Sequence, residues 1–224
     1  MEQNFEQYLQ PGKYIDSDHP EVRAFAFKHK GDSADLLRQA VSLYYAVRDG
    51  FIYDPFHVDL SEEHLKASAL LARGRGFCVE KAALLAACAR VIGIPSRIGL
   101  ADVRNHLGAE RLQKILQSDV FACHGFTELF LEGRWVKATP AFNKSLCEKL
   151  GVNPLEFDGK KDSIFQEYDG HNGNERKFME YLTDHGSFSD VPRAFIIQTL
   201  HTHYPHLFEH PDSEAIKSTL HLRL

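Results

Sequence analysis

Gly74-Arg75-Gly76-Phe77-Cys78-Val79-Glu80-Lys81 places a cysteine at the boundary between a glycine-containing loop and a helical sequence. The two glycines allow the chain to bend tightly. From 81 to 94 the sequence is rich in Ala, Leu, Cys and Arg, most of which favour a helix. Unpaired backbone N–H groups and the helix dipole stabilise a thiolate at such a position. We therefore expect Cys78 to be a nucleophile with a lowered thiol pKa.

The sequence on either side of this stretch changes from helical to strand-like periodicity. Upstream, apolar spacing predicts helices over 21–29, 35–47 and 61–73, the last with Ser61 as its N-cap. Downstream, strands are predicted over 96–103, 120–131 and 135–139, with a polar helix or loop over 107–117. Helices followed by an antiparallel sheet indicate an α+β fold. No linker or repeat is visible, so we expect a single domain over 1–224.

The last third of the chain is less regular. We expect a helix over 176–184 and either a helix or a strand over 194–204. Loops rich in Asp, His and Asn separate these segments. The region 144–224 is thus a candidate cap over the cysteine, although the same composition suits a solvated surface.

A cysteine nucleophile needs a base, and His124 is the best placed of the 13 histidines. It begins a predicted hairpin strand, which fixes the direction of a side chain. If Glu132-Gly133 is a two-residue turn, His124 lies opposite Ala141. Thr139 and Asn143 are then its diagonal neighbours. Cys123 is expected to point to the other face of the strand, into the core.

The chain resembles the transglutaminase-like superfamily of papain-like cysteine enzymes at several motifs in the same order. Tyr53 ends a short strand, and Gly76-Phe77-Cys78 opens a helix. Arg90-Val91-Ile92-Gly93-Ile94-Pro95-Ser96-Arg97 is close to the family's "R-x-x-G-I-P-x-R" segment. His124 and Gly133-Arg134-Trp135-Val136, at the place of the "G-x-W" turn, complete the match, which covers about 35–143. The resemblance implies a papain-like core with the cysteine-bearing helix packed on an antiparallel sheet.

The resemblance also implies a triad of cysteine, histidine and aspartate, and here the chain departs from the family. The family's "D-P-T" or "D-A-T" is Thr139-Pro140-Ala141 in this sequence. A threonine hydroxyl can accept a hydrogen bond from imidazole but carries no charge to stabilise imidazolium. Thr139 is therefore the candidate third residue, and Asn143 is the alternative residue that orients His124.

Composition excludes several other classes of function. The net charge of −5 and the lack of a basic block give no reason to expect nucleic acid as a partner. No signal-like N-terminus or long apolar run is present, so we expect a cytoplasmic protein without a membrane partner. His201, His203, His206 and His210 lack accompanying ligands at metal-binding spacing. No metal or cofactor is expected, and the sequence does not set the oligomeric state.

Two functions remain open at this point. The first is a cysteine-dependent acyl-transfer enzyme that acts on a peptide or protein amide, as a protease, an amidase or a transglutaminase. For a chain without calcium-loop motifs, hydrolysis is the expected outcome. The second is a binding module that kept the fold but lost activity, as Thr139 suggests.

Overall fold

The structure is a computed structural model that describes residues 5–105, 110–164, 167–168, 176–177, 179–209 and 220–224. Its helices are η1 (Glu6–Tyr8), α1 (Pro20–His29), α2 (Leu36–Gly50), α3 (Ala67–Arg73), α4 (Cys78–Val91), α5 (Glu110–Leu116), α6 (Lys144–Leu150), α7 (Arg193–His203) and α8 (His206–Glu209). Its strands are β1 (Ile52–Tyr53), β2 (Arg75–Gly76), β3 (Ser96–Asn105), β4 (Val120–Leu131), β5 (Arg134–Ala138), β6 (Glu167–Tyr168), β7 (Arg176–Lys177) and β8 (Met179–Phe188). The α+β prediction is confirmed.

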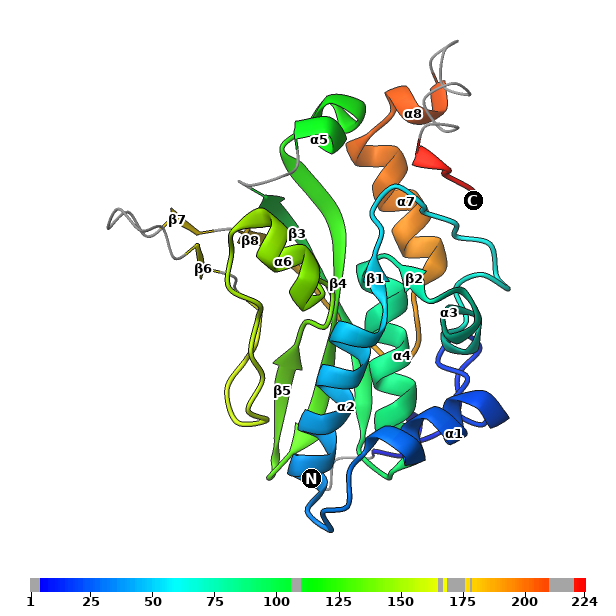
Figure 1. The fold of residues 1–224 in the computed structure, drawn as a ribbon. Helices are drawn as coiled ribbons and strands as arrows, with labels where there is room; N and C mark the ends of the chain where they lie inside the picture. The colour runs from blue at the N-terminus through cyan, green and yellow to red at the C-terminus, as the bar shows by residue number, and fades with distance from the viewer. Residues whose placement is uncertain (1–4, 106–109, 165–166, 169–175, 178, 210–219) are drawn as a thin grey trace.

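The main sheet is antiparallel with the strand order β5-β4-β3-β8. Helix α4 packs on β4 and β3, and α1, α2 and α3 pack around α4 (Figure 1). Helix α4 is buried on nearly all sides, which explains why its sequence is apolar almost throughout instead of along one stripe. The predicted cysteine-bearing helix on an antiparallel sheet is therefore present.

The turn between β4 and β5 is the predicted two-residue turn at Glu132-Gly133. Leu131 pairs with Arg134, and both turn residues have positive φ, 47° and 85°. Positive φ at both central positions matches the right-handed twist of the two strands. The register continues to Thr127 opposite Ala138, where β5 ends. The residues that follow β5 approach the end of β4 that carries His124.

A buried lysine fixes that segment relative to the helices. The ammonium group of Lys81 donates hydrogen bonds to the carbonyl oxygens of Arg48, Phe51 and Ala141 at 2.8–2.9 Å. These carbonyls satisfy all three donors of a lysine that has no exposed surface. Lys81 thus ties α4 both to the end of α2 and to the chain after β5.

Two predicted helices differ in the structure, the one over 176–184 and the one that was expected to begin at Ser61. The helix expected over 176–184 is wrong, because the chain there forms β7 and most of β8. Pairing of β8 with the free edge of β3 satisfies its backbone, so a tertiary contact overrides the local pattern. The segment 194–204 is mostly helix α7. Residues 107–109 of the expected 107–117 excursion lie outside the described residues, and α5 follows them.

The helix predicted from Ser61 begins later, at Ala67. Ser61 instead lies in a turn, where its carbonyl accepts the N–H groups of His64 and Leu65. The N–H of Ala67 is donated to the carbonyl of Tyr14, which anchors the first helical residue to a different part of the chain. No helix within the described ranges is long and apolar enough to cross a membrane.

Candidate active site

Cys78 is the first residue of α4, at the predicted change from loop to helix. The residues before it are held by Glu80, whose carboxylate accepts the Phe77 N–H at 2.9 Å and pairs with Arg73. Gly76 is required here, since a Cβ at this position would lie 2.5 Å from the Glu80 carboxylate. Glu80 thus acts as a capping residue. Burial raises the pKa of its carboxyl to about 8.

The lowered pKa expected for Cys78 is not found. The thiol is buried, and burial raises its pKa to about 11. The backbone N–H groups of Gly125, Val79 and Cys78 itself act in the opposite direction but do not offset the loss of water. Cys78 is therefore a neutral thiol surrounded by backbone donors.

His124 lies on β4, opposite Ala101 of β3. Its side chain is buried, and burial lowers the pKa of the imidazole to about 4. The Phe142 ring is nearly parallel to the imidazole at a centroid distance of 6.3 Å, and the Tyr181 ring meets it edge-on at 6.2 Å. Among the described residues, Nε2 of His124 has no hydrogen-bond partner. His124 is thus a neutral imidazole with one ring nitrogen unpaired.

Cys78 and His124 line the same cavity, which has a volume of about 330 Å³. The close approach of their two elements depends on Gly125. A Cβ on this residue would lie 2.8 Å from the Cα of Val79, the second residue of α4. A glycine inside a strand often marks such a contact between backbones.

The structure places Thr139 directly after β5 and buries it. Its N–H is donated to the Ser163 carbonyl, and its carbonyl accepts the Tyr44 hydroxyl. The Thr139 hydroxyl has no hydrogen-bond partner among the described residues, so it does not bond to His124. It lies close enough to Tyr181 to oppose the rise in the pKa of that hydroxyl. No carboxylate therefore occupies the position where the family has its aspartate.

Asn143 is the N-cap residue of α6. Both polar atoms of its side chain form hydrogen bonds with residues other than His124. Its Oδ1 accepts the Tyr53 N–H at 2.9 Å, and its Nδ2 donates to Ser145 at 2.8 Å. The amide therefore holds β1 against α6 and does not bond to His124 in this structure.

Tyr181 is the residue of this site that the sequence did not reveal. It contacts both His124 and Thr139 from β8. The segment was expected to be helical, so the position of Tyr181 on a strand beside His124 could not be inferred from the sequence. Burial raises the pKa of the Tyr181 hydroxyl, which keeps it protonated at neutral pH.

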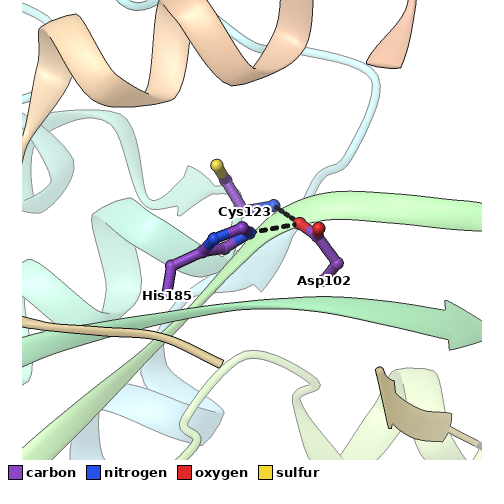
Figure 2. A group of neighbouring side chains, drawn as sticks. All are labelled: Asp102, Cys123 and His185. Carbon is purple, nitrogen blue, oxygen red and sulfur yellow. Dashed lines mark hydrogen bonds and ion pairs between the residues drawn. The ribbon is translucent and has the colours of Figure 1, made fainter. Parts of the chain in front are cut away.

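A second group of titratable side chains lies on the same sheet (Figure 2). His185 Nε2 is 2.8 Å from Asp102 Oδ1, which also accepts the Cys123 N–H at 3.1 Å. His203 Nε2 lies 3.4 Å from Asp102 Oδ2. The possible ligand atoms of Asp102, Cys123 and His185 lie within 4.8 Å of one another, so these residues could approach a metal ion. In this structure the Asp102 carboxylate holds the His185 ring and the backbone of β4 at Cys123.

Cys123 has φ of 58°, which interrupts the alternation of β4. It is buried in the core as expected, but it also lines the cavity with His124 instead of facing only away from it. The β3–β4 register shifts nearby, between Ala101 and Val103. Bulges of this kind redirect side chains, and this one could not be predicted from the alternating sequence.

The other expected structural residues have packing roles. Cys88 and Cys147 are buried free cysteines, as expected. Arg97 pairs with Glu128 and lies over the Trp135 ring at 4.1 Å. Tyr53 packs on Phe142 at 4.6 Å beside the cavity.

A model of the transglutaminase-like superfamily matches residues 23–140, more than half of the chain. The chain belongs to the transglutaminase-like superfamily. This confirms the resemblance, and the match spans the cysteine helix, the His124 strand and the Thr139 position. As a member of the superfamily, the chain belongs to a group of enzymes built around a cysteine. No curated protein sequence matches it.

Solved structures share the fold at low sequence identity. A candidate cysteine protease from Cytophaga hutchinsonii matches with a TM-score of 0.52 and 15% identity over 88% of this chain. This chain spans 50% of that protein. The arylamine N-acetyltransferase from Mycobacterium abscessus gives a TM-score of 0.46 and 15% identity over 91% of this chain and 75% of its own. At these identities the Cytophaga structure supports the papain-like fold alone.

Proposed function

We propose that this superfamily member is a cysteine-dependent acyl-transfer enzyme that hydrolyses an amide bond, with a peptide or protein as the expected substrate. The observation that carries the proposal is a thiol at the first residue of α4 and an imidazole of β4 lining one cavity. A nucleophile and a base facing one space are the minimum that this chemistry requires.

In the first half-reaction, His124 takes the proton of the Cys78 thiol as the sulfur attacks the substrate carbonyl. A C–S bond forms, the C–N bond breaks, and His124 returns the proton to the departing amine. Both groups are neutral before substrate attack, because burial raises the thiol pKa to about 11 and lowers the imidazole pKa to about 4. Proton transfer therefore accompanies attack, and no thiolate–imidazolium pair forms beforehand.

The developing oxyanion needs hydrogen-bond donors. The backbone N–H groups of Cys78 and Val79 lie in the first turn of α4, where a helix leaves its N–H groups unpaired. Both groups influence the sulfur, so they lie close to the reacting atom. They are the donors that we assign to the oxyanion.

Water completes the second half-reaction as hydrolysis, and His124 activates it by removing a proton. An amine in place of water would give transglutamination or another acyl transfer through the same thioester. The two reactions share every residue named so far.

The second candidate is a binding module with little or no activity. Thr139 favours it, because no carboxylate stabilises an imidazolium at His124. In a serine-enzyme triad, removal of that charge lowers kcat by about 10⁴. Under this alternative the cavity binds a ligand but Cys78 does not form a covalent bond with it.

Intact-protein mass spectrometry separates the two candidates. The protein is mixed with p-nitrophenyl butyrate, and the mass and the release of p-nitrophenolate are followed within one turnover. The enzyme proposal expects a burst with a mass increase of one butyryl group, sensitive to hydroxylamine and absent in Cys78→Ala. An unchanged mass, with wild type and variant releasing nitrophenolate equally, would favour the binding module.

A further inference from the structure

The cavity beside Cys78 and His124 is a defined space with mainly apolar walls. Its lining includes Val58, Leu112, Leu116, Leu200, Tyr204 and Leu207, which come from five separate segments of the chain. The space thus extends from the nucleophile toward the C-terminal helices α7 and α8.

A second hydrophobic cluster is organised around this space. Its fully buried members are Leu116, Tyr204, Leu207, Leu220 and Leu222, and all five line the cavity. A cluster that served only stability would close on itself, because interiors pack with few voids larger than a water molecule. Here the apolar side chains surround a hollow instead, and that hollow reaches the reacting thiol.

The polar groups of the lining are largely engaged with the protein. The Tyr204 hydroxyl accepts the Ala122 N–H and donates to the Val120 carbonyl, both at 2.8 Å, so its ring faces the cavity without a free donor. Within the described lining, Asp54 is the one acidic or basic residue besides His124. Its carboxylate accepts the Phe56 N–H and pairs with His57 at 2.7 Å. A charged or strongly polar ligand would lose water there without equivalent partners.

We propose that this cavity holds the acyl group of the substrate and that this group is an apolar chain of about eight to ten carbons, or an aromatic acyl group of that size. The inference rests on the proposed function, because the thioester fixes the first acyl atom at Cys78. Pockets of this volume are typical of small-molecule sites. At roughly 30 Å³ for each non-hydrogen atom, the volume per water molecule in the liquid, about ten such atoms fit.

This proposal keeps the Cys78–His124 thioester chemistry but replaces the peptide or protein acyl donor expected above with a derivative of an apolar carboxylic acid. A polypeptide segment would bring several backbone N–H and C=O groups into the cavity, and each would need a partner. The leaving group lies outside the cavity and stays unrestricted by it.

The test is a single-turnover series of p-nitrophenyl esters from acetyl to dodecanoyl, together with a charged acyl group of hexanoyl length. Each rate constant for Cys78 acylation is divided by that for free cysteine, which corrects for ester reactivity. We expect a rise of about threefold to fourfold per methylene. The rise should end near decanoyl, and the charged acyl group should gain nothing over acetyl.

Two cavity-filling variants test whether the acyl chain lies in this cavity. Leu200→Trp fills the cavity and should flatten the chain-length dependence, so that the ratio of the decanoyl to the acetyl rate constant falls toward one. Leu112→Trp fills the cavity from α5 instead of α7 and serves if the first variant does not fold. Leu182→Trp, on an exposed leucine of β8, is the matched control and should behave as wild type.

The outcomes separate the two proposals. If Cys78 is acylated equally by acetyl and decanoyl esters, or if the dependence survives in both filled variants, the cavity proposal is overturned and the enzyme proposal stands. If no ester acylates Cys78, the enzyme proposal itself fails.

Discussion

Two cysteine–histidine pairs involve this sheet, one between β4 and the start of α4 and the other on β4 and β8. They divide the features of a catalytic triad between them. His185, near Cys123, has a carboxylate partner, with Asp102 at 2.8 Å. His124 shares a cavity with Cys78 but has no partner at Nε2 among the described residues. Only Cys78 lies at the start of a helix, whereas Cys123 is inside β4.

The comparison teaches that a carboxylate beside a histidine does not by itself mark the reactive pair. Asp102 also accepts the N–H of Cys123, so it stabilises the irregular part of β4. The Cys78 pair has helix N–H groups around the sulfur, which the other pair lacks. Both of its members line the cavity, whereas of the second pair Cys123 lines it and His185 does not. We therefore propose a catalytic role for Cys78 and His124 and a structural role for Asp102 and His185.

The largest expected effect comes from removing each thiol in turn. Cys78→Ala should lower the single-turnover acylation rate by at least about 10⁴, because no other group can form the thioester. Cys123→Ala should change it by less than about threefold. Stopped-flow release of nitrophenolate measures both variants. Loss of activity in Cys123→Ala with a normal melting curve would reverse the assignment.

The two histidines should differ almost as strongly. His124→Asn removes the base, and general-base contributions of 10²–10⁴ are typical, so acylation should fall by about 10³. His185→Asn should keep the rate within about threefold while lowering the melting temperature, since Asp102 loses its partner. Equal rate losses in the two variants would show that the pairs are not distinct.

Supplying the missing charge should have an intermediate effect. Thr139→Asp places a carboxylate beside Tyr181 and His124, and a nearby opposite charge raises a histidine pKa by about 1–3 units. We expect acylation at pH 6–7 to become about tenfold faster, with the pH–rate limb assigned to His124 shifted upward. Thr139→Asn has the same shape without the charge and should produce no such shift. A faster reaction in both variants would mean that charge is not the cause.

The burial of His124 also has an expected effect on stability in acid. The pKa of His124 is about 4 in the fold and about 6.5 when unfolded, so the unfolded chain binds the proton first as the pH falls. This contribution is therefore complete above pH 6.5 and is lost progressively toward pH 4, by roughly 3 kcal/mol in total. The contribution of Glu80, whose pKa is raised to about 8, changes with pH in the opposite direction. It is the same in the wild type and in a His124→Asn variant, so it cancels when the two are compared.

Urea unfolding of wild type and His124→Asn between pH 4 and pH 7 isolates this term. The wild type should lose about 3 kcal/mol more than the variant across that range. Parallel stability curves would show that His124 is not buried as a neutral imidazole.

Local sequence predicted the parts of the site that local physics controls. Glycines before Cys78 and helix formers after it were sufficient to place this cysteine at a helix start. Glu132-Gly133 fixed the hairpin register that brings the chain after β5 toward His124. The pKa of Cys78 was predicted in the wrong direction, because burial depends on side chains from distant segments.

The remaining features depend on contacts between distant parts of the chain. Tyr181 reaches the site only because β8 adds to the edge of β3, and the bulge at Cys123 changes which side chains face the cavity. The cavity itself is closed by residues up to Leu222, far from the family motifs. None of these has a periodic signal in the sequence.

The most direct measurement is to locate the trapped acyl group by peptide mapping. Wild-type protein is quenched in acid during the burst with p-nitrophenyl octanoate and digested at low pH, which preserves thioesters. The account predicts octanoyl on the peptide that contains Cys78 and none on the peptide that contains Cys123. Octanoyl on Cys123, or on neither cysteine, would contradict it.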